Sequence, residues 1–146
     1  MKSTRLKARI AGTAAAVAVL GGAALATAPT AAAKANVISI ERAQLRGGAL
    51  SVTVKYSCDT GLSWRLVTKM TKVDQKADPT SVAKATVPAN KIICDYQDRV
   101  LNVKLQPAKG SHFVKGDEVK VAATYFAADE PETENWNPLS LITTVL

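Results

Sequence analysis

The sequence predicts an all-β protein, a two-sheet sandwich of about seven short strands that follows an N-terminal export signal. Apolar residues recur at every second position through most of residues 34–146, which is the pattern of half-buried strands. Gly, Pro and Asx residues interrupt this pattern at regular intervals, as in the turns at 46–48 and 109–111. No segment of useful length shows a helical period. Short strands with this spacing favour two packed sheets.

The first 33 residues predict a cleaved secretory signal peptide. A basic start precedes an uncharged, Ala-rich stretch over residues 10–28, and its basic residues are Lys2, Arg5, Lys7 and Arg9. Small residues follow, so we expect cleavage after Ala33, with Ala35 as the alternative. An uncleaved anchor is the competing interpretation, but Ala and Gly contribute little transfer free energy to a membrane span. We therefore expect a secreted, extracellular protein without a stable membrane anchor.

Residues 34–146 have the length of one domain with a single core, and we expect a monomer. Removing residues 1–33 takes away four of the nineteen Lys and Arg residues and none of the twelve acids, so the net charge falls from +7 to +3. Nucleic-acid binding depends on clustered positive charge, and a small surplus argues against it.

Cys58 and Cys94 are the only cysteines, and an even number in an exported chain predicts a disulfide. The alternative is a pair of free or metal-binding thiols. One histidine and two distant cysteines do not make a structural zinc site. We expect no metal and no cofactor.

Alternation defines the strands in chain order. Five strands have clear inward-facing residues: Ile38 and Ile40; Leu50, Val52, Val54 and Tyr56; Trp64, Leu66, Thr68 and Met70; Leu101, Val103 and Leu105; and Val119, Val121, Ala123 and Tyr125. A weaker strand is predicted over 82–87 and a last strand over 139–146. The residues between them, such as Arg65, Val67 and Lys69, are predicted to face solvent.

The Ala-rich signal and three short motifs support a family resemblance. The motifs are Val-Lys-Tyr-Ser-Cys at 54–58, Ile-Cys-Asp at 93–95 and Gly-Asp-Glu-Val-Lys-Val at 116–121. Trp64, early in the third strand, fits the large core aromatic residue of immunoglobulin-like folds. With them the chain resembles the small secreted immunoglobulin-like sandwich proteins of high-GC Gram-positive bacteria. The resemblance covers the whole mature region. It implies the fold and the extracellular location, and no activity.

In an immunoglobulin-like order, the connections after the second, fourth and sixth strands gather at one end of the sandwich. Aromatic and acidic residues of these connections are the candidate ligand-binding residues: Asp59, Tyr96, Asp129, Glu130, Glu132, Glu134 and Trp136. Such a surface suits a cationic partner or a divalent ion. The alternative is a solvated acidic loop with Trp136 folded back on the sandwich. The opposite end is predicted to be basic, through Lys104, Lys109, Lys115 and Lys120.

No catalytic residue is predicted. His112 lies in a turn, and no serine-nucleophile signature accompanies it. The expected function is that of a secreted non-enzymatic binding or interaction module for an extracellular protein, a polysaccharide or a small ligand. The alternative is a small hydrolase or protease inhibitor that presents residues 127–138, and a minimal hydrolase is a third class.

Overall fold

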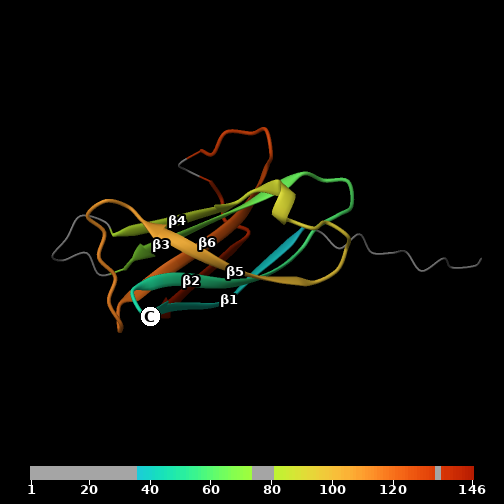
Figure 1. Ribbon diagram of the computed structural model, residues 1–146. Helices are drawn as coiled ribbons and strands as arrows, with labels where there is room; N and C mark the ends of the chain where they lie inside the picture. The colour runs from blue at the N-terminus through green and yellow to red at the C-terminus, as the bar shows by residue number, and fades with distance from the viewer. Residues whose placement is uncertain (1–35, 74–80, 134–135) are drawn as a thin grey trace, which may run out of the picture. The chain divides into compact units, whose positions relative to one another are not determined.

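The computed structural model describes residues 36–73, 81–133 and 136–146, which contain seven antiparallel β-strands (Figure 1). The predicted signal peptide, its cleavage sites and the start of the predicted domain at residue 34 lie outside these residues. The elements are β1 (Val37–Arg46), β2 (Ala49–Ser57), β3 (Trp64–Lys72), β4 (Val82–Val87), the 3₁₀ turn η1 (Ala89–Lys91), β5 (Arg99–Pro107), β6 (Glu118–Ala127) and β7 (Ser140–Val145).

The strands form one nearly closed sheet in the order β1-β2-β5-β4-β3-β6-β7. β4 joins the two halves of this sheet, because it pairs with β3 along its length and with β5 at Ala83↔Pro107 and Lys84↔Gln106. At the other side β1 approaches β7, where the Ile40 N–H donates to Ser140 Oγ at 3.2 Å. The all-β class and the seven strands are thus confirmed, and the separation into two immunoglobulin-like sheets stays a prediction.

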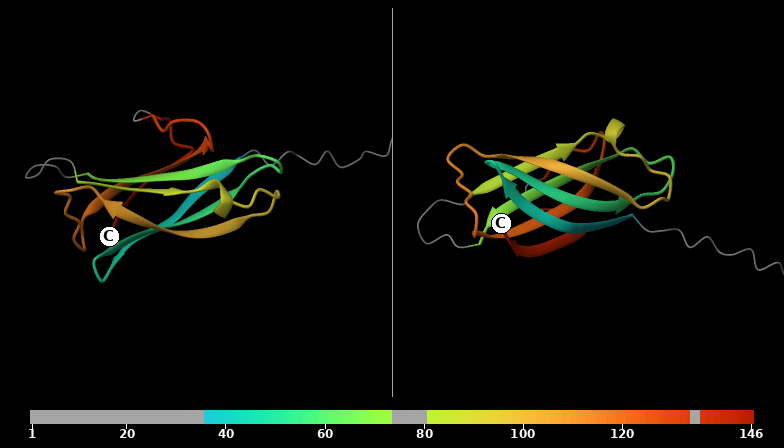
Figure 2. Two further views of the ribbon diagram at one scale, coloured as in Figure 1. Left: turned by 45° about the horizontal axis from the view of Figure 1, so that its top comes forward. Right: turned by 60° about the horizontal axis from the view of Figure 1, so that its bottom comes forward.

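The predicted alternation determines the core. In β2, Leu50, Val52, Val54 and Tyr56 are at most 2 % exposed, while the residues between them are half-buried or exposed. Inward residues of β1, β3, β5 and β6 join them in one cluster. Figure 2 shows how the sheet curves around its interior. Trp64 and Leu101, also predicted inward, are partly buried against this cluster. Burying these apolar side chains is the main term that stabilises the sheet.

Tyr125 ties β6 to the first two strands from inside the core. Its hydroxyl lies 3.3 Å from the Ser57 carbonyl oxygen and 3.4 Å from that of Val37, and both oxygens are acceptors for its proton. Burial raises the pKa of Tyr125 above its ordinary value, so the hydroxyl stays a donor. The contact helps to bring the ends of the sheet together.

Asp117 connects the β5–β6 turn to β3 and to the last residue. Its carboxylate accepts a hydrogen bond from the Val114 N–H at 2.8 Å and lies 2.8 Å from Lys72 Nζ. Its carbonyl oxygen accepts from the Leu146 N–H at 3.0 Å. Burial alone would raise the pKa of Asp117, but the hydrogen bonds from Lys72 and Val114 outweigh that effect, and the pKa is lowered.

We expect Asp117→Asn to lower the free energy of unfolding by about 1–2 kcal/mol at pH 7, because charge-assisted hydrogen bonds are lost. The folded pKa is depressed, so the ionised group stabilises the fold above the unfolded value of about 4. That contribution disappears as the pH falls through the folded pKa. Urea unfolding at several pH values should therefore show wild type and variant converging in acid. Asp129→Asn, in an exposed turn, is the control and should change little; a pH-independent difference would contradict the assignment.

Candidate functional site

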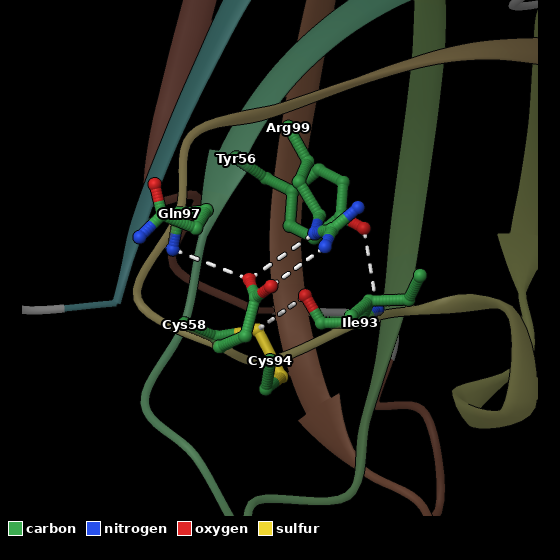
Figure 3. Close-up of polar contacts among 7 residues, drawn as sticks. Tyr56, Cys58, Ile93, Cys94, Gln97 and Arg99 are labelled. Atoms are coloured by element: carbon green, nitrogen blue, oxygen red, sulfur yellow. Dashed lines mark hydrogen bonds and ion pairs between the residues drawn. A yellow bond between two sulfur atoms is a disulfide. The ribbon is translucent and has the colours of Figure 1, made fainter.

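The disulfide joins the connection after β2 to the connection before β5. Cys58 and Cys94 are bonded, with an S–S length of 2.08 Å and a Cα–Cα distance of 4.7 Å, which confirms the predicted bond. Figure 3 shows the surrounding contacts. The Tyr96 N–H donates to the Cys58 carbonyl at 3.1 Å, and the Ile93 N–H donates to Tyr56 Oη at 3.2 Å. These bonds fix both connections against the end of β2.

An ion pair shapes the turn between Cys94 and β5. Arg99 donates to both carboxylate oxygens of Asp95, at 3.1 Å from Nε and 2.6 Å from Nη2, and the Gln97 N–H donates to Oδ1 at 3.2 Å (Figure 3). The Arg99 hydrogen bond is the main cause that lowers the pKa of Asp95. Asp95 is therefore engaged in holding the turn and presents no free carboxylate there.

Two of the predicted site residues, Asp59 and Tyr96, lie together at this end. The Asp59 N–H donates to Asn36 Oδ1 at 3.3 Å, and the Thr60 hydroxyl donates to Tyr96 Oη at 3.4 Å. Tyr96 has φ of 62°, the one positive φ of a non-glycine residue in the described ranges, and the residue is 45 % exposed. The disulfide and the Asp95 turn hold this less favourable backbone conformation.

The third predicted connection lies between β6 and β7. Its described residues, 128–133 and 136–139, begin at the same end and then lie outside the sheet. The Ala128 N–H donates to the Ser63 carbonyl at 3.0 Å. Figures 1 and 2 show the coloured parts of this segment outside β3 and β4. The predicted site residues Asp129 and Glu130 are exposed on it, and Glu134 lies outside the described residues.

Arg65 of β3 anchors this segment. Its Nε donates to the Ala127 carbonyl at 3.2 Å, its Nη2 donates to the Glu130 carbonyl, and its Nη1 lies 3.8 Å from Glu132 Oε1. The Thr86 hydroxyl on β4 donates to the same Glu132 oxygen at 2.8 Å. Glu132, predicted as a ligand-binding residue, thus serves to hold the segment over β3 and β4.

A small apolar cluster lies beneath the segment, outside the main core. Val67 and Phe126 are 1 % and 6 % exposed, although neither belongs to the core cluster. The Trp136 ring meets Phe126 edge-on at 6.2 Å, and the Arg65 guanidinium lies 5.8 Å from the centre of the Phe126 ring. The prediction that Val67 faces solvent is therefore wrong, because the segment covers the outer face of β3 at this point.

Beyond this cluster the outer face of β3, β6 and β7 forms a groove of about 390 Å³. Its floor is formed by residues that are paired across the three strands. Lys69 lies opposite Ala122, Ala122 lies opposite Leu141, and Thr71 lies opposite Lys120. The segment between β6 and β7 supplies the remaining wall. The lining residues are Lys69, Thr71, Lys120, Ala122, Trp136, Pro138 and Leu141.

The structure thus places the predicted site residues in two groups. Asp59 and Tyr96 lie at the disulfide end, and Trp136 lines a groove further along the outer face. Within the described ranges no hydrogen bond or ion pair joins the acidic residues of the segment to Asp59 or Tyr96. Over the same ranges no three His, Cys, Asp or Glu side chains are grouped so that they could hold a metal ion.

Sequence reasoning missed the two lysines of the groove as site residues. Alternation predicts only that Lys69 faces solvent, and the strand order predicts Lys120 at the basic end of the sandwich. The available signal was their outward position on two strands. The pairing of β3 with β6, which brings them into one groove, was not available from alternation.

The chain matches no protein-family model, no curated protein and no solved structure. In the part of the chain that the structure describes, no helix is long and apolar enough to span a membrane.

Proposed function

We propose that the protein is a secreted, non-enzymatic binding module and that the groove beside Trp136 is its ligand site. The observation that carries this proposal is the groove itself, which combines an aromatic wall with a floor of both apolar and basic residues. Its volume falls within the range of roughly 300–1,000 Å³ that small-molecule sites occupy. The ligand is accordingly a small molecule or a short stretch of a polymer.

The chemistry of the lining supports recognition. Lys69 and Lys120 supply ammonium groups, Thr71 supplies a hydroxyl, and the other lining side chains are apolar or aromatic. General acid–base catalysis uses groups within hydrogen-bond reach of a reacting proton, usually His, Asp or Glu. In the described lining no such side chain occurs, and Glu132 on the covering segment is bound by Arg65 and Thr86.

Secretion is supported by the signal-like residues 1–33 and by the disulfide. Disulfides persist in oxidising compartments and are rare in the cytosol. The Cys58–Cys94 bond is compatible with an extracellular location.

The strand order supports an immunoglobulin-like arrangement of two layers. In the sheet order β1, β2 and β5 are neighbours, as are β3, β6 and β7, and β4 stands between the two sets. These are the groupings that immunoglobulin-like sandwiches place in opposite sheets. The two-residue pairing of β4 with β5 is then a local bridge between the layers.

Binding of the processed, secreted protein to an array of immobilised oligosaccharides and peptides tests the proposed site. We expect at least one array member to be retained, and Trp136→Ala to weaken its binding about tenfold, because buried aromatic anchors dominate binding energy. Tyr96→Ala, at the disulfide end, is the matched control and should bind as wild type. Loss of binding in Tyr96→Ala but not in Trp136→Ala would move the site to the disulfide end. Saturable inhibition of secreted proteases would favour the inhibitor alternative.

A further inference from the structure

We infer that the groove recognises an anionic saccharide, whose sugar ring stacks on Trp136 and whose carboxylate or phosphate groups bind Lys69 and Lys120. This inference rests on the proposed function and adds the chemical class of the ligand. Three features carry it: the placement of lysines on the outer face, the lack of ion pairs for these lysines within the described residues, and the aromatic wall.

The strand register gathers three lysines on one face. Lys69 on β3 lies directly opposite Lys84 on β4, and Lys120 lies on β6 opposite Thr71, two residues further along β3. Residues two apart on a strand share a face, so all three project from the outer side of the sheet. Lys69 and Lys120 line the groove, and Lys84 stands beside it across the β3–β4 pair.

These lysines differ from other basic residues of the domain. Lys55 binds Asp98 at 3.0 Å and Lys72 binds Asp117 at 2.8 Å. In the described ranges no ion pair or hydrogen bond is found for the side chains of Lys69, Lys84 or Lys120. Glu118 projects from the same face of β6 as Lys120, but it does not line the groove.

Two like charges placed directly opposite each other destabilise a sheet. Lys69 and Lys84 carry this cost, and in the described ranges neither forms an ion pair. The carboxylate of Glu132, on the segment above them, is held by Arg65 and Thr86. Solubility alone is served by lysines anywhere on the surface and does not require them to be opposed. An anionic ligand between the lysines relieves the repulsion, so the arrangement favours an anion as occupant.

The aromatic wall specifies the rest of the ligand. Trp136 is held by its edge-on contact with Phe126 and lines the groove together with Pro138 and Leu141. A sugar ring presents an apolar C–H face that packs on an indole ring, while its substituents reach the ammonium groups. The groove is shallow and lies on an open sheet face, which suits a sugar unit within a chain better than an acyl chain that needs enclosure.

Calorimetric titration of the processed protein at low salt tests the inference with four probes. They are trigalacturonate, a phosphorylated trisaccharide, maltotriose as the neutral sugar and triglutamate as an anion without sugar. We expect one or both anionic sugars to bind at least tenfold more tightly than maltotriose and triglutamate. The first two probes distinguish carboxylate from phosphate recognition. Binding should weaken towards about 0.2 M salt, because exposed charges are screened.

Variants identify the groups involved. Lys69→Gln should reduce the affinity for the anionic sugar about fivefold, as expected for a partly exposed charged contact. Lys109→Gln removes one positive charge from a turn outside the groove and should leave affinity unchanged. The melting temperature of Lys69→Gln should not fall, because the variant removes the repulsion with Lys84. If the affinity of that variant falls while its melting temperature does not, the cause is the lost contact between Lys69 and the sugar and not a loss of folding.

Each contrary result has a defined meaning. Equal binding of maltotriose, sensitive to Trp136→Ala, would overturn the anionic ligand and leave the proposed binding site in place. Equal binding of triglutamate would assign the groove to an acidic peptide. Unchanged affinity in Lys69→Gln would overturn the role of the lysines. No binding of any probe would overturn the inference, and only a negative oligosaccharide and peptide array would overturn the proposed function as well.

Discussion

The double variant Cys58→Ala, Cys94→Ala is expected to lose about 3–4 kcal/mol of its free energy of unfolding. The bond spans 36 residues, and in the chain-entropy model a loop of this length restricts the unfolded chain by that amount. Domains of this size are stable by only about 5–15 kcal/mol, so the loss is a large fraction of the total. The melting temperature should fall by roughly 15 °C.

Urea unfolding measures this loss, with reduced wild type as the matched comparison. Reduced wild type and the oxidised double variant should unfold at similar urea concentrations, because both lack the same constraint. Alanine is the appropriate replacement at position 58, since Cys58 is 1 % exposed and a serine hydroxyl would be buried there. A double variant as stable as oxidised wild type would show that the connections at this end are held by their hydrogen bonds alone.

Leu66→Ala is expected to lower the free energy of unfolding by about 3 kcal/mol, within the range of 2–5 kcal/mol measured for such core truncations. Leu66 is fully buried in β3, opposite Val87 on β4 and Tyr125 on β6. Removing its branched end leaves a cavity between strands that pair on both sides, so relaxation around it is restricted. Thermal and urea unfolding should both show the loss.

Val100→Ala on β5 is the matched control. Val100 is 64 % exposed, and its truncation should change the free energy of unfolding by no more than about 0.5 kcal/mol. Equal effects of Leu66→Ala and Val100→Ala would contradict the assignment of faces. A register shifted by one residue would exchange the buried and exposed sets of a strand, so the pair tests the alternation directly.

The strands and their inward faces could be predicted because each depends on neighbours in the sequence. Burying Val52 and Val54 while exposing Lys55 requires only that side chains alternate across a strand. The short strand over 82–87 was found from the same signal, with the same bounds as β4. The disulfide followed from the number of cysteines and the predicted export of the chain.

Strand pairing and loop placement could not be predicted, because they depend on contacts between distant residues. Nothing in residues 82–87 indicates that β4 pairs with both β3 and β5 and so joins the sheet into one. Likewise Val67 looks solvent-facing until the segment after β6, anchored on Arg65, covers it. The groove depends on both kinds of contact, so its lysines and Trp136 appeared in the sequence as unrelated residues.

The meeting of β1 and β7 bears on how the protein resists self-association. Free strand edges present unpaired N–H and C=O groups that recruit strands from other molecules and seed aggregates. Here one edge lies against the other, the Ile40 N–H is occupied by the Ser140 hydroxyl, and the register of β1 shifts between Ile40 and Arg42. An irregular, partly occupied edge is a poor template for another chain. The closure that shapes the core therefore also protects the protein at high concentration.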